Sequence, residues 1–241
     1  MITELCPQVA DSAPGELRSP KLKNLTTVVS LTESAIGGIY GWSDFVDLAK
    51  CTTDEELENR QRDQNPDDAI NIQYTSGTTG FPKGATLSHH NILNNGYFVA
   101  RIMNFTEEDR LVVPVPLYHC FGMVMANLGC LTHGACAIYP SEGFEPEAVL
   151  EAVEKEKATA LFGVPTMFIA ELALPNFSKY DLSTLRTGIM AGAPCPVETM
   201  KQVNDLMNMT EVEIAYGMTE TSPVSFQTRV DSPINKRVST V

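Results

Sequence analysis

The strongest constraint on the fold is an alternation of short apolar runs with longer amphipathic segments over most of the chain after residue 65. The apolar runs have the length of buried strands and occupy residues 111–114, 137–139, 160–165, 185–191 and 212–215. Helical periodicity occurs between them, most clearly at 145–157 and 197–209. This order is typical of an α/β fold, so we expect a largely parallel sheet with flanking helices.

The most distinctive motif is the stretch YTSGTTGFPKG at residues 74–84. Its glycines let backbone N–H groups approach an anion, its hydroxyls add donors, and Lys83 supplies a positive charge, so the stretch suits a polyphosphate. A glycine-rich surface turn is the alternative interpretation. A Walker loop is excluded because Pro82 precedes the lysine and Gly84 follows it. Ser88 is expected to cap a following helix, giving the order strand, phosphate loop, helix.

The composition narrows the class of protein. The net charge of −13 argues against a nucleic-acid surface, and no apolar run has the length of a membrane span. The cysteines form no C-x-x-C pair, so we expect reduced, mostly buried thiols of an intracellular protein. The first residues are similar to neither a secretory signal nor an Arg-rich transit peptide, so we expect an internal piece of a longer protein.

The first quarter of the chain, residues 1–64, carries no recognisable chemistry. A strand is expected at 25–31, a helix capped by Ser43 through Lys50, and a solvated helix at 54–63.

Beyond residue 65, unusual polar or glycine-rich segments follow expected strands, at 75–84, 117–122, 191–196 and 216–223. Ligands gather at the carboxyl ends of parallel strands, so we expect these segments to form one site.

The same segments resemble signature motifs of the adenylate-forming (AMP-binding) superfamily, which includes acyl-CoA synthetases, luciferases and peptide-synthetase adenylation domains. YTSGTTGFPKG resembles the phosphate loop, PLYHCFG the acyl-pocket segment, AGAP the adenine-side turn and YGMTETSP the second nucleotide signature. All four occur in family order between about residues 65 and 225. The resemblance is strongest to mitochondrial medium-chain fatty-acid CoA ligases.

The resemblance implies a reaction of two steps. A fatty acid attacks the α-phosphate of ATP to give acyl-AMP and pyrophosphate, and the thiol of coenzyme A then takes the acyl group. It also implies that residues 1–241 are an incomplete, internal part of the large N-terminal domain, with 1–64 a poorly informative lead-in and 65–241 the nucleotide- and acyl-binding core. The small C-terminal domain is expected to be absent. A truncated nucleotide-binding or scaffold fragment without turnover is the alternative.

The resemblance also assigns roles to individual residues. The β- and γ-phosphates would be held by Thr75, Ser76, Gly77, Thr78, Thr79, Gly80 and Lys83. Thr219 would contact the α-phosphate, and Glu220 would hold Mg²⁺. The adenine would be stacked or lined by Tyr216, Gly217, Gly192, Ala193 and Pro194. Lys83, Thr219 and Glu220 would be the catalytic residues, and the acyl pocket would be walled by His119, Phe121 and Gly122.

Several of these residues have a second interpretation. Alone, Tyr216 would be a half-buried aromatic and Glu220 a surface carboxylate, but the flanking motif favours the functional roles. The pair His119-Cys120 invites a nucleophile or a metal site. Neighbouring side chains on a strand point to opposite faces, which argues against a direct dyad. The expected partners are therefore small molecules, namely a fatty acid, ATP with Mg²⁺, and coenzyme A, and a mitochondrial location follows from the resemblance alone.

Overall fold

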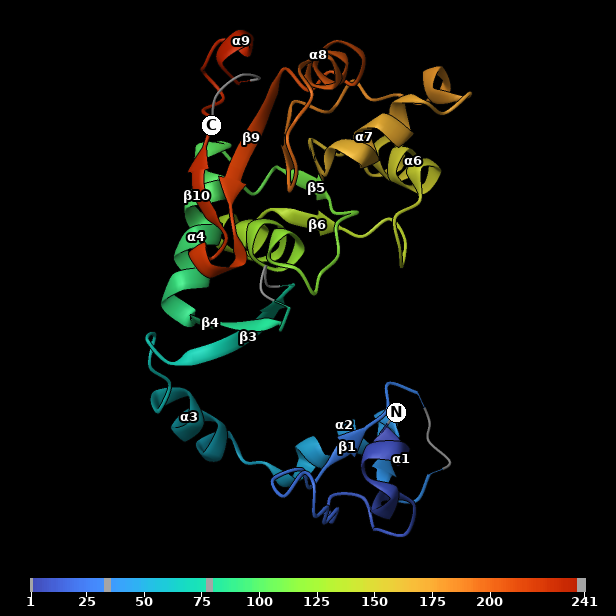
Figure 1. Ribbon diagram of the computed structural model, residues 1–241, viewed down its shortest axis with the longest axis vertical. Helices are drawn as coiled ribbons and strands as arrows, with labels where there is room; N and C mark the ends of the chain where they lie inside the picture. The colour runs from blue at the N-terminus through green and yellow to red at the C-terminus, as the bar shows by residue number, and fades with distance from the viewer. Residues whose placement is uncertain (1, 33–35, 77–79, 238–241) are drawn as a thin grey trace. The chain divides into compact units, whose positions relative to one another are not determined.

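The computed structural model describes residues 2–32, 36–76 and 80–237 (Figure 1). Its contacts divide the chain into two compact units, Met1–Gln64 and Asn65–Val241.

The first unit is small and built around a short parallel pair of strands, β1 (Val28–Val29) and β2 (Ile39–Tyr40). Its core consists of Cys6, Val9, Leu17 and Ile39. The helical segments are α1 (Ile2–Leu5), η1 (Pro7–Ala10), α2 (Trp42–Asp47), η2 (Leu48–Cys51) and α3 (Asp54–Arg62).

Two expectations for this unit were wrong in detail. The strand expected over 25–31 is only two residues long, because only Val28 and Val29 find a partner strand. Gly41, not Ser43, precedes the first turn of α2, which therefore begins without a side-chain cap. By contrast α3 starts where expected, after Thr53, whose hydroxyl accepts a hydrogen bond from the Glu56 N–H at 3.2 Å.

The second unit is organised around a six-stranded sheet in the order β10-β9-β8-β7-β5-β6. The strands are β5 (Arg110–Val112), β6 (Cys136–Ile138), β7 (Ala160–Gly163), β8 (Thr187–Ala191), β9 (Glu211–Gly217) and β10 (Val224–Gln227). All neighbours are parallel except β10, which runs antiparallel to β9. Every residue of β7 and β8 is buried, as the uninterrupted apolar runs predict for central parallel strands. The largely parallel α/β fold is thus confirmed.

Helices cover both faces of this sheet (Figure 1). One core contains residues of α6 (Pro146–Glu156), α7 (Pro165–Leu172) and α8 (Val197–Leu206), together with Leu161 and Met190 of the sheet. The other contains residues of α4 (His89–Ile102), the π-helix η3 (Phe121–Leu128) and α5 (Gly129–His133), together with Phe162 and Ile189. Because neighbouring strand residues point to opposite faces, each central strand contributes to both cores. Short segments complete the unit at η4 (Phe177–Lys179), η5 (Thr219–Thr221) and α9 (Ile234–Arg237).

A separate antiparallel hairpin, β3 (Ala69–Thr75) and β4 (Lys83–Ser88), carries the glycine-rich segment at its turn. The expected order of strand, loop and helix was therefore wrong: the loop leads into a return strand, and only then does Ser88 cap α4, accepting from the Asn91 N–H at 3.3 Å. Segment 75–84 also follows a strand outside the main sheet. The return strand pairs with β3, and Leu87 is buried in a cluster with Ile92, Cys120 and Val124. The strand is too short and polar for its periodicity to be recognised in the sequence.

A charged cluster ties together the beginnings of the strands, at the edge opposite to their carboxyl ends. Arg186, just before β8, donates hydrogen bonds to Asp109 at 2.9 Å and to Glu211 at 2.7 Å. Burial opposes ionisation of Asp109, yet hydrogen bonds from Thr159 and Arg186 outweigh it and lower the pKa of this carboxyl. The cluster therefore joins the starts of β5, β8 and β9 at one edge of the sheet.

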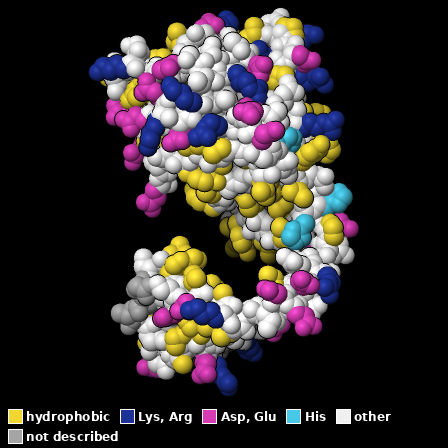
Figure 2. All heavy atoms as spheres, turned by 180° about the vertical axis from the view of Figure 1, so that it is seen from behind, with side chains coloured by type: hydrophobic (Ala, Val, Ile, Leu, Met, Phe, Trp, Pro, Cys, Tyr) yellow, Lys and Arg dark blue, Asp and Glu magenta, His cyan; other side chains and the backbone are white. Residues whose placement is uncertain are grey.

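Apolar side chains are exposed over part of the surface of the larger unit (Figure 2). On β3, Ile70, Ile72 and Tyr74 are exposed, while the alternate residues Asn71 and Gln73 are half-buried. Among the residues that the structure describes, none of the helices combines the length and apolar character that a membrane span requires.

Candidate active site

A cavity of about 310 Å³ opens at the carboxyl ends of β8 and β9. Its lining comes from several separate segments of the larger unit and comprises Thr75, His119, Phe121, Met125, Ala191, Gly192, Ala215, Tyr216, Gly217, Met218, Thr219, Glu220, Pro223 and Val224. The four segments expected to form one site thus all contribute to one cavity. The hairpin β3-β4 takes part even though it lies outside the main sheet.

The cavity brings together many of the residues proposed from the sequence, namely Thr75, His119, Phe121, Gly192, Tyr216, Gly217, Thr219 and Glu220. Other proposed residues lie outside its lining, namely Ser76, Gly80, Lys83, Gly122, Ala193 and Pro194. The proposed phosphate ligands Gly77, Thr78 and Thr79 lie outside the described residues.

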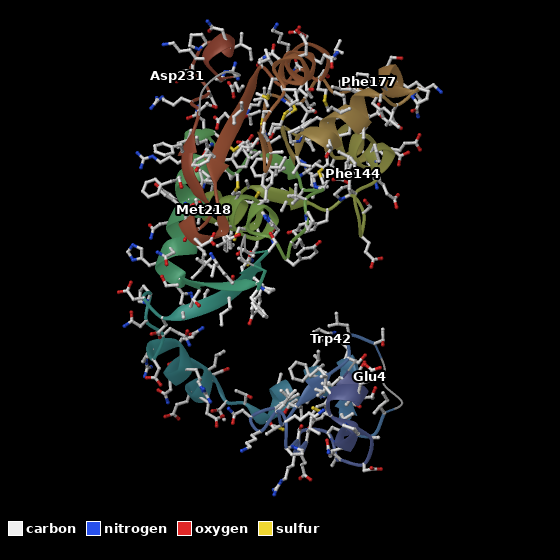
Figure 3. All side chains as sticks on the ribbon, in the orientation of Figure 1. Glu4, Trp42, Phe144, Phe177, Met218 and Asp231 are labelled. Atoms are coloured by element: carbon white, nitrogen blue, oxygen red, sulfur yellow. The ribbon has the colours of Figure 1, made fainter. Side chains whose placement is uncertain are left out.

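The turn between β9 and β10 forms one wall, with Met218 at its start (Figure 3). The Met218 N–H donates to the Pro223 carbonyl at 3.0 Å, and the Thr221 N–H donates to the Met218 carbonyl at 2.9 Å. A Cβ atom on Gly217 would lie 1.9 Å from the Pro223 carbonyl oxygen. Only glycine therefore permits the turn to close this tightly.

Two polar side chains of this turn face the cavity. Thr219 is half-buried, whereas Glu220 is exposed and makes no hydrogen bond or ion pair with the described residues. A carboxylate with its oxygens free can accept a cation. The described residues contain no cluster of three metal-ligating side chains, so a cation at Glu220 would take its other ligands from a bound molecule or water.

Tyr216 and Gly192 lie next to each other at the carboxyl ends of the neighbouring strands β9 and β8. Ala191 pairs with Ala215 in the register of β8 and β9, so Gly192 and Tyr216 lie at the corresponding next positions. The Tyr216 side chain is 53% exposed, and its ring centroid lies 6.4 Å from that of Phe226. Gly192 has a positive φ of 86°, which favours glycine there. The edge can therefore accept a flat ring against Tyr216.

The glycine-rich hairpin reaches the cavity from the other side. Thr75 lines the cavity, and Lys83 lies directly opposite it in the antiparallel register. Strand β4 also contacts the helical turn η5, which carries Thr219 and Glu220. The lysine is exposed and lies beside the cavity rather than in its wall.

His119 and Cys120 have different surroundings. They lie in the turn leading into η3, so the strand geometry assumed from the sequence was wrong. The exposed His119 lines the cavity, and its Nδ1 accepts from the Phe121 N–H at 3.1 Å. Cys120 is buried and donates to Oε1 of Gln73 at 3.1 Å. Burial raises the pKa of this thiol to about 11, which disfavours a nucleophilic thiolate at neutral pH.

The remaining cysteines depart partly from expectation. Cys6 and Cys130 are buried and Cys195 is half-buried, but Cys51 and Cys136 are exposed because they lie at the ends of short elements. None of the six is in a disulfide.

From residue 8 to residue 241 the sequence matches the AMP-binding enzyme family. The chain belongs to this family.

Curated relatives of this AMP-binding chain include YngI of Bacillus subtilis, named as an acyl-CoA synthetase, which is 50% identical over all of this chain and 44% of its own length. The medium-chain acyl-CoA ligase ACSF2, mitochondrial, of Danio rerio is 44% identical over 94% of this chain and 38% of its own length. A solved structure, ATP-bound MatB from Rhodopseudomonas palustris, is similar with a TM-score of 0.65 at 28% identity, over 84% of this chain and 39% of MatB. The chain therefore spans less than half the length of these relatives.

Three lining residues, Met125, Ala215 and Val224, lie outside the segments expected from the sequence to form the site. Ala191, Met218 and Pro223 lie within the expected segments 191–196 and 216–223, although no individual role was assigned to them. Ala191 and Ala215 are small apolar residues of central strands, and only the register of β8 and β9 places them side by side. Val224 begins a strand whose pairing with β9 turns it back toward the cavity. For Ala191 and Ala215 the sequence indicated a strand, which predicts the face on which a side chain lies but not its neighbour on the next strand.

Proposed function

We propose that this chain is the nucleotide- and acyl-binding part of an acid-thiol ligase that activates a fatty acid with ATP and transfers it to coenzyme A. The observation that carries the proposal is the single cavity lined by all four signature segments. Relatives named as acyl-CoA ligases, at 44% identity in Danio rerio and 39% in Homo sapiens, support the same class of reaction.

In the proposed reaction, the chain's residues act mainly by neutralising and positioning charge. Thr75, Ser76, Gly80 and Lys83, with Gly77, Thr78 and Thr79 outside the described residues, would bind the β- and γ-phosphates and steady the departing pyrophosphate. Thr219 would donate to the α-phosphate, where the carboxylate attacks. This assignment uses the contact between β4 and η5, which keeps the lysine strand next to Thr219.

Mg²⁺ fits the arrangement at Glu220. Its carboxylate lines the cavity without a partner among the residues that the structure describes, and Mg²⁺ is commonly bound by one or two carboxylates together with substrate phosphates. When bound, the ion would neutralise charge on the triphosphate. Tyr216 would stack on adenine, with Gly217, Gly192, Ala193 and Pro194 around the base.

The acyl group is proposed to lie against His119, Phe121 and Gly122, with Met125 as a further apolar wall. Gly122 would act indirectly, because a Cβ there would lie 2.5 Å from the Pro116 carbonyl oxygen and would displace the turn that carries His119. A medium-chain fatty acid and a mitochondrial location are proposed from the ACSF2 relatives, which carry both words in their names.

The test is ATP affinity, measured with a fluorescent ATP analogue and Mg²⁺, together with ATP–pyrophosphate exchange driven by fatty acids of different length. Lys83→Ala and Glu220→Ala should each weaken binding or exchange by at least about tenfold. Lys83 would neutralise the triphosphate directly, whereas Glu220 would act through the Mg²⁺ ion that it holds. Lys23→Ala, which changes an exposed lysine of the first unit, should have no effect. Unchanged binding and exchange in both site variants would overturn the assignments.

The exchange reaction also distinguishes a ligase from a module that binds nucleotide without turnover. Nucleotide binding without fatty-acid-dependent exchange would favour a nucleotide-binding module without turnover. Absence of nucleotide binding in the wild type would overturn the proposed function itself.

A further inference from the structure

A side chain outside the cavity holds one of its walls at two points. Asn95, a half-buried residue of α4, donates from Nδ2 to the Val224 carbonyl at 2.9 Å. Its Oδ1 accepts from the Val224 N–H at 3.1 Å. The amide therefore pairs with both backbone groups of one residue, as a neighbouring strand would.

Val224 is the point where the cavity wall becomes a strand. It lines the cavity together with Pro223, and it pairs with Gly217 in the hairpin β9-β10. The sheet gives it a partner on one side only, because β10 is the edge strand. Asn95 supplies the partner on the other side.

Helix α4 is a firm support for this contact. Gly96 packs so closely against η3 that a Cβ there would lie 2.9 Å from the Val124 carbonyl oxygen. Val99 and Ala100 are buried in the core on the same side. The helix also receives a second bond from β10, since Gln227 Nε2 donates to the Val99 carbonyl at 3.3 Å.

The same helix begins directly after the glycine-rich hairpin, at its cap Ser88. One rigid element is thus joined to β4 by the chain and to the 216–224 wall by Asn95. The relative placement of the two sides of the cavity depends on both connections.

We propose that Asn95 is a positioning residue that fixes the wall at 216–224 and so sets the affinity of the cavity for nucleotide. The effect on nucleotide affinity rests on the proposed function, whereas the effect on the position of the wall does not.

The chemistry of the amide makes the proposal specific. In Asn95→Ala, the Val224 N–H loses its acceptor and the Val224 carbonyl loses its donor. In Asn95→Asp, the ionised carboxylate still accepts from the Val224 N–H but repels the Val224 carbonyl oxygen. A protonated aspartic acid both donates and accepts, so it reproduces the asparagine pattern. The Asp variant should therefore recover function as the pH falls, which a merely space-filling role would not produce.

The experiment compares Asn95→Ala and Asn95→Asp with wild type in the full chain. Asn94→Ala is the matched control, because Asn94 is exposed on the same helix and its side chain donates to the His90 carbonyl one turn earlier rather than to the cavity wall. The first measurement is hydrogen exchange of the Val224 amide without nucleotide. The second is affinity for a fluorescent ATP analogue between pH 5 and pH 8.

We expect at least about tenfold faster exchange at Val224 and about tenfold weaker nucleotide binding in Asn95→Ala, with no change in the control. For Asn95→Asp the deficit in affinity relative to wild type should narrow toward pH 5. Wild-type exchange at Val224 in Asn95→Ala overturns the proposal, and so does faster exchange with unchanged nucleotide affinity. If wild type binds no nucleotide, the proposed function fails, while the exchange measurement still decides whether Asn95 fixes the wall.

Discussion

Glu213 is a buried acid close to the candidate site. It lies on β9 two residues before Ala215, which lines the cavity, and it is fully buried. Burial raises the pKa of its carboxyl to about 8, although a hydrogen bond from Gln227 and the charge of Arg237 act in the opposite direction. The folded protein therefore holds a proton here that the unfolded chain releases above its ordinary pKa of 4.5.

This proton makes stability depend on pH. Between about pH 4.5 and 8 the folded state binds more protons than the unfolded state, so stability falls as the pH rises. The loss amounts to at most about 1.4 kcal/mol for each pH unit from this group. Glu213→Gln keeps an acceptor for Gln227 and should flatten this part of the slope in urea unfolding measured from pH 5 to pH 8.

A second buried acid provides the comparison. Burial also raises the pKa of Glu171, on α7, well above its usual value. Glu171→Gln should therefore also reduce the fall of stability with rising pH, independently of Glu213. The double variant should be flatter than either single variant. Equal slopes in wild type and Glu213→Gln would contradict the assignment of the proton to Glu213.

At the scale of elements, the hairpin β9-β10 depends on close approach of its two backbones at Gly217. Gly217→Ala places a methyl group where the Pro223 carbonyl oxygen lies, so the turn must open. We expect a loss of about 1–3 kcal/mol in stability, as for other overpacked sites, and at least tenfold weaker nucleotide binding.

Gly143→Ala is the control for that variant. A Cβ on Gly143 meets no atom within 4 Å, so the substitution should leave both the unfolding free energy and nucleotide affinity unchanged. Nucleotide affinity of the wild-type value in Gly217→Ala would show that the closed turn is not needed for binding.

The elements also show what could be predicted from the sequence. β7 and β8 were predictable because a strand buried on both faces is a continuous apolar run. The return strand β4 was not, since Lys83 to Thr86 has the composition of a loop and is held by pairing with β3. The change from the π-helix η3 to the α-helix α5 could not be predicted either, because hydrophobic periodicity does not distinguish the two kinds of helical turn.

The residues of the candidate site could likewise be predicted only in part. Residues within recognisable motifs, such as Tyr216 and Thr219, could be proposed from the sequence and lie together in the cavity. Asn95 and Ala215 could not, because their importance comes from a partner across the fold. Local chemistry is visible in a sequence, whereas contacts over long separations require the topology.

At the scale of the whole molecule, the division between Gln64 and Asn65 should be accessible to protease. Helix α3, which immediately precedes it, buries none of its residues, and the contacts described for it are its own capping box and surface pairs such as that of Arg62 with Glu58. Such an element opens locally at little cost. Trypsin should therefore cut first after Arg60 or Arg62 and leave a stable product containing the larger unit, identified by mass spectrometry.

Arg60→Gln combined with Arg62→Gln should slow this first cut. Arg186, whose guanidinium is bonded to Asp109 and Glu211, should be cut only after the larger unit unfolds. A first cut within residues 65–237, with α3 intact, would contradict the proposed order.

The contact between Asn95 and Val224 joins positions 129 residues apart in the chain. During synthesis, the glycine-rich hairpin and α4 leave the ribosome long before the strand that Asn95 holds. The cavity cannot be completed until residue 224 has emerged, so a nucleotide bound there cannot assist the folding steps that come before this point of synthesis.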